Sequence, residues 1–263
     1  MYTAEYRTMK IEDLVQKIQN LISNRRMGST SEEDKDIWQV IRFRDSFRHK
    51  LNAAYFHFNL VRQIKKDVQF IIEKDMHGKG QFLIGDDNIR EKIDLTRQVQ
   101  FKCTVLVEDI LYHITSTIDN LPKIISVYYR TVDSGEGFRT ARKQLNHEHT
   151  KDLEITHLIN KDWDEWIEKT MDFRGEIFHH HSKTVEASRT TSFGKNDDGS
   201  QYFNEDIVVV VPEKLRLALG FQRDKVEIEE FCTAIFDKMY SFCNGLFDIL
   251  ISEHEKISRI PSA

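Results

Sequence analysis

The sequence predicts an all-α fold, an antiparallel four-helix bundle with extra short helices and one inserted β-hairpin. Four long stretches place apolar residues at three- and four-residue steps, the period of an amphipathic helix. The 263 residues include only three prolines and eleven glycines, so few positions interrupt helices. We find no repeat, low-complexity tract or linker. A single helical domain over residues 1–263 is therefore expected, with its core at about 32–253.

The first half of the chain predicts three helices. A short amphipathic helix covers about residues 11–22. A long helix follows from about 32 to 74, and Ser31 in front of it suits an N-cap. Arg44 interrupts the apolar stripe of this helix, so we expect it to be partly buried and to have a partner. A second long helix runs from about 88 to 121.

The second half continues this pattern around one β-hairpin. Pro122 ends or kinks the preceding helix, and one or two short helices are expected within 138–158. A third core helix starts near Asn160 or Asp162 after a reversal of the chain. Two strand-like segments at about 184–211 predict a β-hairpin, and the last long helix covers about 226–253.

Composition limits the function classes. The net charge is −5, so the chain lacks the broad basic surface of a constitutive nucleic-acid binder, and any RNA would need a local cluster. The three cysteines, Cys103, Cys232 and Cys243, lie among apolar neighbours and are expected to be buried free thiols. No apolar run reaches the ~18 residues that span a bilayer. The N-terminus has no apolar signal-peptide core, so we expect a cytoplasmic protein without a membrane partner.

The segment MDFRGEIFHHHSK, residues 171–183, holds the main candidate site. Arg174 and His179 are separated by four residues, late on a predicted helix, with apolar residues just before three consecutive histidines. This Arg-x4-His motif on a helical bundle resembles the HEPN superfamily. The resemblance covers the motif and the four-helix plan, not the chain from end to end.

The resemblance implies a metal-independent endoribonuclease of the kind used in toxin or defence systems, with no cofactor. Arg174 and His179 would form the catalytic pair, assisted by Glu176 and His180. Because family members usually dimerise, a homodimer is expected, and an antitoxin-like protein partner is compatible with this role. RNA or phosphate would be bound by Arg174, His181 and Lys183, since Arg174 and His181 share one helix face. The alternative is a non-catalytic interaction or nucleotide-binding module on the same bundle.

Two questions stay open at this point, and a third possibility, a metal site, is not expected. The same spacing joins Arg44 to His49 and Arg142 to His147, so spacing does not select the functional pair. The second motif position, usually Asn, Asp or His in the family, is Gly175 here, which leaves room for a non-cleaving member. A metal site would need the two Glu-x-x-His pairs, Glu154 with His157 and Glu176 with His179, to meet. The expected reversal near Asn160 places them too far apart, so no metal is expected.

Overall fold

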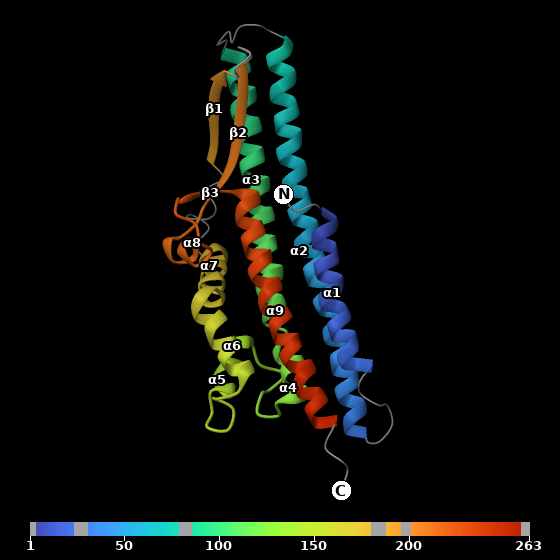
Figure 1. Ribbon diagram of the computed structural model, residues 1–263. Coiled ribbons are helices and arrows are strands. Elements are labelled where there is room, and N and C mark those ends of the chain that lie inside the picture. The colour runs from blue at the N-terminus through green and yellow to red at the C-terminus, as the bar shows by residue number, and fades with distance from the viewer. Residues whose placement is uncertain (1–3, 24–30, 79–85, 180–187, 196–200, 259–263) are drawn as a thin grey trace. The chain divides into compact units, whose positions relative to one another are not determined.

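The computed structural model describes residues 4–23, 31–78, 86–179, 188–195 and 201–258 (Figure 1). Most of these residues are helical, and one small antiparallel sheet is inserted before the last helix. The predicted fold class, all-α with an inserted β-hairpin, is confirmed.

Three of the predicted bundle helices are long helices of the structure: α2 (Ser31–Gly78), α3 (Asp86–Ile118) and α9 (Ile228–Ser258). The helix expected at about 11–22 is longer than predicted and forms α1 (Ala4–Ser23). Helix α2 ends at Gly78, about one turn past the expected end near residue 74. Glycine is a common residue at the C-terminal end of a helix.

Short helices follow α3. Pro122 ends the previous helix and begins a new one, α4 (Pro122–Tyr128), where its missing N–H costs nothing. Helix α5 (Phe138–Leu145) starts after Gly137 and buries Phe138, Ala141 and Leu145.

The predicted start of the third core helix was wrong. Helix α6 (Glu154–Asp162) begins about two turns earlier, and it continues through a π-helical turn, η1 (Trp163–Ile167), into α7 (Glu168–His179). The residues on both sides of each junction keep right-handed helical backbone angles, so the chain does not reverse near Asn160. Asn160 is a common turn residue, but here its side chain bonds to Arg142 and Asn146 instead of ending the helix.

The sheet has three strands in the order β1-β2-β3, all antiparallel. Strands β1 (Ser188–Lys195) and β2 (Gln201–Val210) form the predicted hairpin, with Phe193 opposite Phe203. Helix α8 (Glu213–Ala218) then returns the chain to β3 (Lys225–Glu227), which was not predicted. A strand of three residues is too short to reveal an alternating pattern.

The chain forms two compact units, each assembled from distant segments. The first unit comprises residues 1–54, 112–168 and 236–263, and the second comprises 55–111 and 169–235. Helices α2, α3 and α9 each pass without a break from one unit to the other.

The core of the first unit is aromatic. Phe43, Phe47 and Phe247 pack ring against ring with centroids 5.4–6.3 Å apart. A second group of rings lies around Phe242 and includes residues of α5 and η1. The centroids of neighbouring rings in this group are 5.9–6.4 Å apart. Its members are Phe138, Trp163, Trp166 and Phe242. Edge-to-face pairs of this kind add to the stability that burial provides.

Helix α1 packs between α2 and α9 in the first unit. Its buried residues Ile11, Leu14, Ile18 and Leu21 recur at helical spacing. Its polar contacts show that α1 is parallel to α9 and antiparallel to α2. These contacts are Lys10–Asp237, Asp13–Tyr240, Lys17–Asp248, Glu12–Arg48 and Gln19–Arg44.

The second unit encloses its core between helices and sheet. Its buried side chains include Phe58, Val107, Phe173, Val209 and Phe231. Cys103 and Cys232 are buried here and Cys243 is buried in the first unit, and all three are free thiols, as predicted. Across the described parts of the chain, no helix is long and apolar enough to cross a bilayer.

Candidate functional site

The candidate pair lies at the C-terminal end of α7, in the second unit. Thr170 and Phe173 are buried and anchor this helix by one face, and Arg174 next to them is half-buried. His179 is the last residue of α7.

The other predicted site residues lie wholly or partly outside the described residues. The side chains of Glu176 and His179 lie outside the described part, and so do residues His180, His181 and Lys183 altogether. Their predicted roles, including the shared face of Arg174 and His181, therefore stay predictions.

Gly175 occupies the second motif position and has space around it. A Cβ built on Gly175 meets no heavy atom within 4 Å, apart from its own neighbours along the helix. Its φ angle lies in the ordinary helical range, since Gly220 is the one glycine with positive φ among the described residues. A Cβ at position 175 would thus fit without moving any of the described atoms.

The first competing motif, Arg44 to His49, has an arginine with a structural role. Arg44 Nη1 donates to Gln19 Oε1 at 2.5 Å, and its Nε donates to Asp45 Oδ1 at 2.9 Å. Arg44 thereby links α2 to α1, which confirms that it needed a partner. His49 is exposed in the middle of α2.

The second competing motif, Arg142 to His147, also has an arginine with a structural role. Arg142 Nε donates to Asn160 Oδ1 at 2.8 Å, and its guanidinium lies 5.2 Å from the centre of the Trp163 ring. A further ion pair joins Arg142 to Asp164 at 3.1 Å. These contacts hold α5 against the start of the π-helical turn, and His147 is exposed after the end of α5.

The reversal near Asn160, on which the sequence argument against a metal site depended, is absent. Glu154 and His157 are both exposed on α6. No group of three His, Cys, Asp or Glu residues that could hold a metal ion occurs among the described residues.

The π-helical turn places Asp162 beside a tryptophan. Trp166 Nε1 donates to Asp162 Oδ1 at 2.7 Å. Burial of the carboxyl raises the pKa of Asp162 above its ordinary value, and the hydrogen bond from Trp166 offsets part of that effect. Nearby Glu165 raises the pKa further, because a second negative charge disfavours ionisation.

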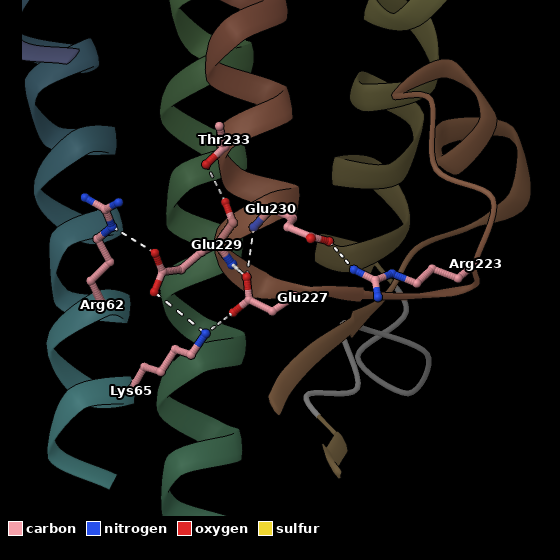
Figure 2. Close-up of polar contacts among 7 residues, drawn as sticks. All are labelled: Arg62, Lys65, Arg223, Glu227, Glu229, Glu230 and Thr233. Atoms are coloured by element: carbon pink, nitrogen blue, oxygen red, sulfur yellow. Dashed lines mark hydrogen bonds and ion pairs between the residues drawn. The ribbon is translucent and has the colours of Figure 1, made fainter. Parts of the chain in front are cut away.

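A polar cluster that was not predicted from the sequence joins α2 to the start of α9 (Figure 2). Arg62 Nε donates to Glu229 Oε2 at 3.0 Å, and Lys65 Nζ donates to Glu227 Oε1 at 2.8 Å. The other oxygen of Glu227 accepts the backbone N–H groups of Glu229 at 2.9 Å and Glu230 at 3.0 Å.

The chemistry of this cluster is structural. Glu227 satisfies two of the amide donors that the first turn of a helix leaves without intrahelical partners. Its negative charge also suits the positive end of the helix dipole. A glutamate just before a helical pattern is a weak sequence signal, and its partner Lys65 is 162 residues away.

Comparisons with known proteins assign no relative to this chain. No protein-family model, no curated protein and no solved structure matches it.

Proposed function

We propose that this chain is a HEPN-like endoribonuclease that cleaves RNA without a metal ion, through Arg174 and His179. The position of this motif supports the choice of residues. Arg174 and His179 lie late on a core helix, α7, which buried Phe173 anchors. This position and the apolar neighbours of the motif fit the family resemblance.

The proposed reaction is attack of a ribose 2′-oxygen on the adjacent phosphorus. His179, in its neutral form, accepts the 2′-hydroxyl proton as a new bond forms between the 2′-oxygen and phosphorus. The bond from phosphorus to the 5′-oxygen breaks, and the departing oxygen takes up a proton, so the products are a 2′,3′-cyclic phosphate and a 5′-hydroxyl. Arg174 donates hydrogen bonds to the non-bridging oxygens as negative charge builds there.

Two protomers are part of this proposal. On a regular helix, residues five positions apart point about 140° away from each other. Arg174 and His179 of one chain therefore make a poor cleft by themselves. In a homodimer, Arg174 of one protomer and His179 of the other can approach the same phosphate.

The test is cleavage of single-stranded RNA in EDTA, with product ends identified by mass spectrometry. We expect cyclic-phosphate ends from the unaltered protein. His179→Ala should lower the rate by about 10²–10⁴-fold, the usual contribution of general acid–base catalysis. Arg174→Ala should lower the rate as well, and Arg174→Lys should restore only part of it, because a single ammonium does not provide the bidentate contact.

The matched controls are His49→Ala and His147→Ala, which alter the exposed histidines of the competing motifs. Both should cleave as the unaltered protein does. Equal loss in a control and in His179→Ala would contradict the assignment of the motif. Cleavage that disappears in EDTA and returns with added metal would replace this mechanism by a metal-dependent hydrolase.

A non-catalytic interaction or nucleotide-binding module is the second candidate, and Gly175 favours it. The second motif position of the family usually carries a side chain that can orient the histidine or the phosphate, and glycine has none. Because the space at this position is open, Gly175→Asn should fold normally. A stable dimer that is inert toward many RNAs, and stays inert as Gly175→Asn, would favour the module.

A further inference from the structure

Helices α2 and α3 expose an apolar face within the second unit. Phe56 and Phe101 are 59% and 71% exposed, and Leu60 and Val105 are each 37% exposed. Each helix contributes a phenylalanine followed four residues later by an aliphatic residue. We call these four side chains the α2–α3 face. Scattered apolar residues are common on protein surfaces, whereas a group of exposed apolar side chains that includes two aromatic rings is a candidate interaction surface.

Two contacts fix the register of α2 and α3. In the second unit, His57 Nδ1 lies 3.7 Å from Asp109 Oδ2. In the first unit, Lys50 Nζ donates to Ser116 Oγ at 2.6 Å. Lys50 precedes His57 by seven residues on α2, and Ser116 follows Asp109 by seven residues on α3. The two helices are therefore antiparallel.

This register arranges the four side chains in a symmetrical way. Leu60 lies at nearly the same height as Val105, at the centre of the face. Phe56 and Phe101 lie toward opposite ends, one on each helix. Among these four side chains, the aliphatic pair therefore has Phe56 toward one end and Phe101 toward the other. Tyr112 of α3, which is 41% exposed and belongs to the first unit, turns about 60° in the same sense from Asp109 and lies near the height of Phe56.

The four side chains also point to the same side of the helix pair. An α-helix turns by about 100° per residue, so each side chain has a direction around the helix axis. On α2, Phe56 and Leu60 lie roughly 100° and 60° to one side of the direction of His57. On α3, Phe101 and Val105 lie about 80° and 40° from the direction of Asp109, in the same rotational sense. Because the helices are antiparallel and these two residues face each other, equal senses of rotation bring both pairs to one side.

Helix α9 covers the other side. Arg62 and Lys65 turn from His57 in the opposite sense and contact Glu229 and Glu227 at the start of α9 (Figure 2). The α2–α3 face is therefore directed away from the core that α9 helps to enclose.

We propose that the α2–α3 face is the surface through which two copies of this chain associate about a twofold axis. The pattern of the face is self-complementary, since a twofold axis through its centre brings aliphatic residues together and places rings at both ends. An isologous interface requires this kind of self-complementary patch.

The area of the face fits this partner. With about 150–250 Å² for each aromatic side chain, the exposed parts of the four residues offer on the order of 400 Å². Two copies would bury about 800 Å² of this apolar surface. A standard interface of about 1,600 Å² is a little more than half apolar, so the two faces supply nearly the apolar area that a stable dimer needs.

This inference goes beyond the proposed function and shares with it only the expectation that two copies meet, since the α2–α3 face contains neither Arg174 nor His179. Its readout is mass, whereas the readout of the proposed function is RNA cleavage. A dimer without cleavage, or cleavage that survives a change of interface, would therefore separate the two ideas.

The test measures the mass of the full chain by sedimentation from low micromolar to several hundred micromolar concentration. We expect a concentration-dependent species of twice 31.1 kDa. The double variant Phe56→Glu with Phe101→Glu should associate at least tenfold more weakly, because the interface would bury four carboxylates without partners. Both rings are exposed, so the variant should keep its helical circular dichroism.

The matched control is Trp38→Glu. Trp38 is also on α2 and is 59% exposed, but it belongs to the first unit and lies outside the α2–α3 face. This variant should associate as the unaltered chain does. A chain that stays monomeric at all concentrations, or a double variant that associates with unchanged affinity, would overturn the proposal. A different protein on this face would give the first of these results.

Chemical crosslinking provides a second measurement that does not depend on the charged variant. The three native thiols are buried, so a short bismaleimide should join copies only through an introduced cysteine. Leu60→Cys at the centre of the face should give a covalent dimer in high yield. Leu217→Cys, which replaces a residue that is 55% exposed on α8, should not. Equal yields from both positions would count against the α2–α3 face.

Discussion

Gly175 and Gly220 occupy backbone conformations with opposite consequences for substitution. Gly175 lies inside α7 with open space around it, and Gly220 has a φ of 84°. Alanine at position 175 should stabilise the protein by about 0.5–1 kcal/mol, because glycine loses more conformational freedom in a helix. Alanine at position 220 should destabilise it by about 1–2 kcal/mol, because Cβ clashes in the left-handed region. Urea unfolding of both variants measures the two changes.

Gly245→Ala provides a further reference for this comparison. A Cβ at position 245 would lie 3.5 Å from Leu158, which is ordinary van der Waals contact. Its effect should thus have the sign seen at position 175. Destabilisation by Gly175→Ala would mean that an unseen partner occupies the open space beside α7.

Single residues also explain why the sequence could not select one motif. Arg44, Arg142 and Arg174 share the same spacing to a histidine, and spacing contains no information about partners. The partner Gln19 precedes Arg44 by 25 residues, and Asn160 follows Arg142 by 18. Only the folded chain reveals that Arg44 and Arg142 hold helices together. The buried state of the cysteines was predictable because it follows from apolar neighbours on the same helix.

At the scale of elements, the start of α9 depends on one carboxylate. Glu227 caps two backbone amides and pairs with Lys65, and its side chain is only 16% exposed. Glu227→Ala should therefore lower the free energy of unfolding by about 1–2 kcal/mol, the usual range for loss of an N-terminal cap. Glu227→Gln should recover part of this loss, since its amide oxygen can still accept hydrogen bonds. Urea unfolding at neutral pH provides the measurement.

Glu230→Ala is the control for that prediction. Glu230 pairs with Arg223 at the surface, and both side chains are more than half exposed. Exposed pairs contribute little, so a change within about 0.5 kcal/mol is expected. An equal effect at positions 227 and 230 would show that capping is not what Glu227 contributes.

The π-helical turn makes a prediction about pH. The pKa of Asp162 is higher in the folded protein than in the unfolded chain, mainly because the carboxyl is buried. Between those two pKa values the folded state binds more protons, so the contribution of Asp162 to stability falls as pH rises. Asp162→Asn should therefore unfold at higher urea concentration than the unaltered protein at pH 7. This difference should shrink as pH falls toward about 4, near the unfolded pKa.

The hydrogen bond from Trp166 is retained in this variant, because the asparagine oxygen can accept it. Asp152→Asn, at an exposed position, serves as a control and should change stability equally at both pH values. An advantage of Asp162→Asn that is the same at pH 7 and pH 4 would contradict the linkage to ionisation.

The long elements were predictable because their apolar residues repeat over many turns. Helices α2, α3 and α9 begin within two residues of their expected starts. The start of α6 was missed because Asn160 was expected to lie at a reversal of the chain. Its side chain instead bonds to Arg142 and Asn146, and the helix continues through it. Of the candidate site, the structure gives the place of Arg174 and His179 on α7, and the roles of these residues stay predictions.

For the whole molecule, the continuity of the helices predicts how the two units unfold. All three tryptophans, Trp38, Trp163 and Trp166, belong to the first unit, whereas far-ultraviolet circular dichroism reports on both. Because α2, α3 and α9 pass from one unit to the other, we expect the two signals to change together in urea. A Phe221→Trp variant adds a fluorescent reporter in the second unit. Transitions at different urea concentrations would show that the units unfold separately.

The docking of α1 also has a consequence for synthesis of the chain. Lys10 and Asp13 contact residues of α9 that follow them by 227 positions. At about 5–20 residues per second, a ribosome delivers those partners roughly ten to forty-five seconds after α1 itself. During that interval, the apolar stripe of α1 lacks the cover that α9 provides. A nascent chain stalled before residue 237 should thus bind a ribosome-associated chaperone through α1. The chaperone should dissociate from α1 once α9 is complete.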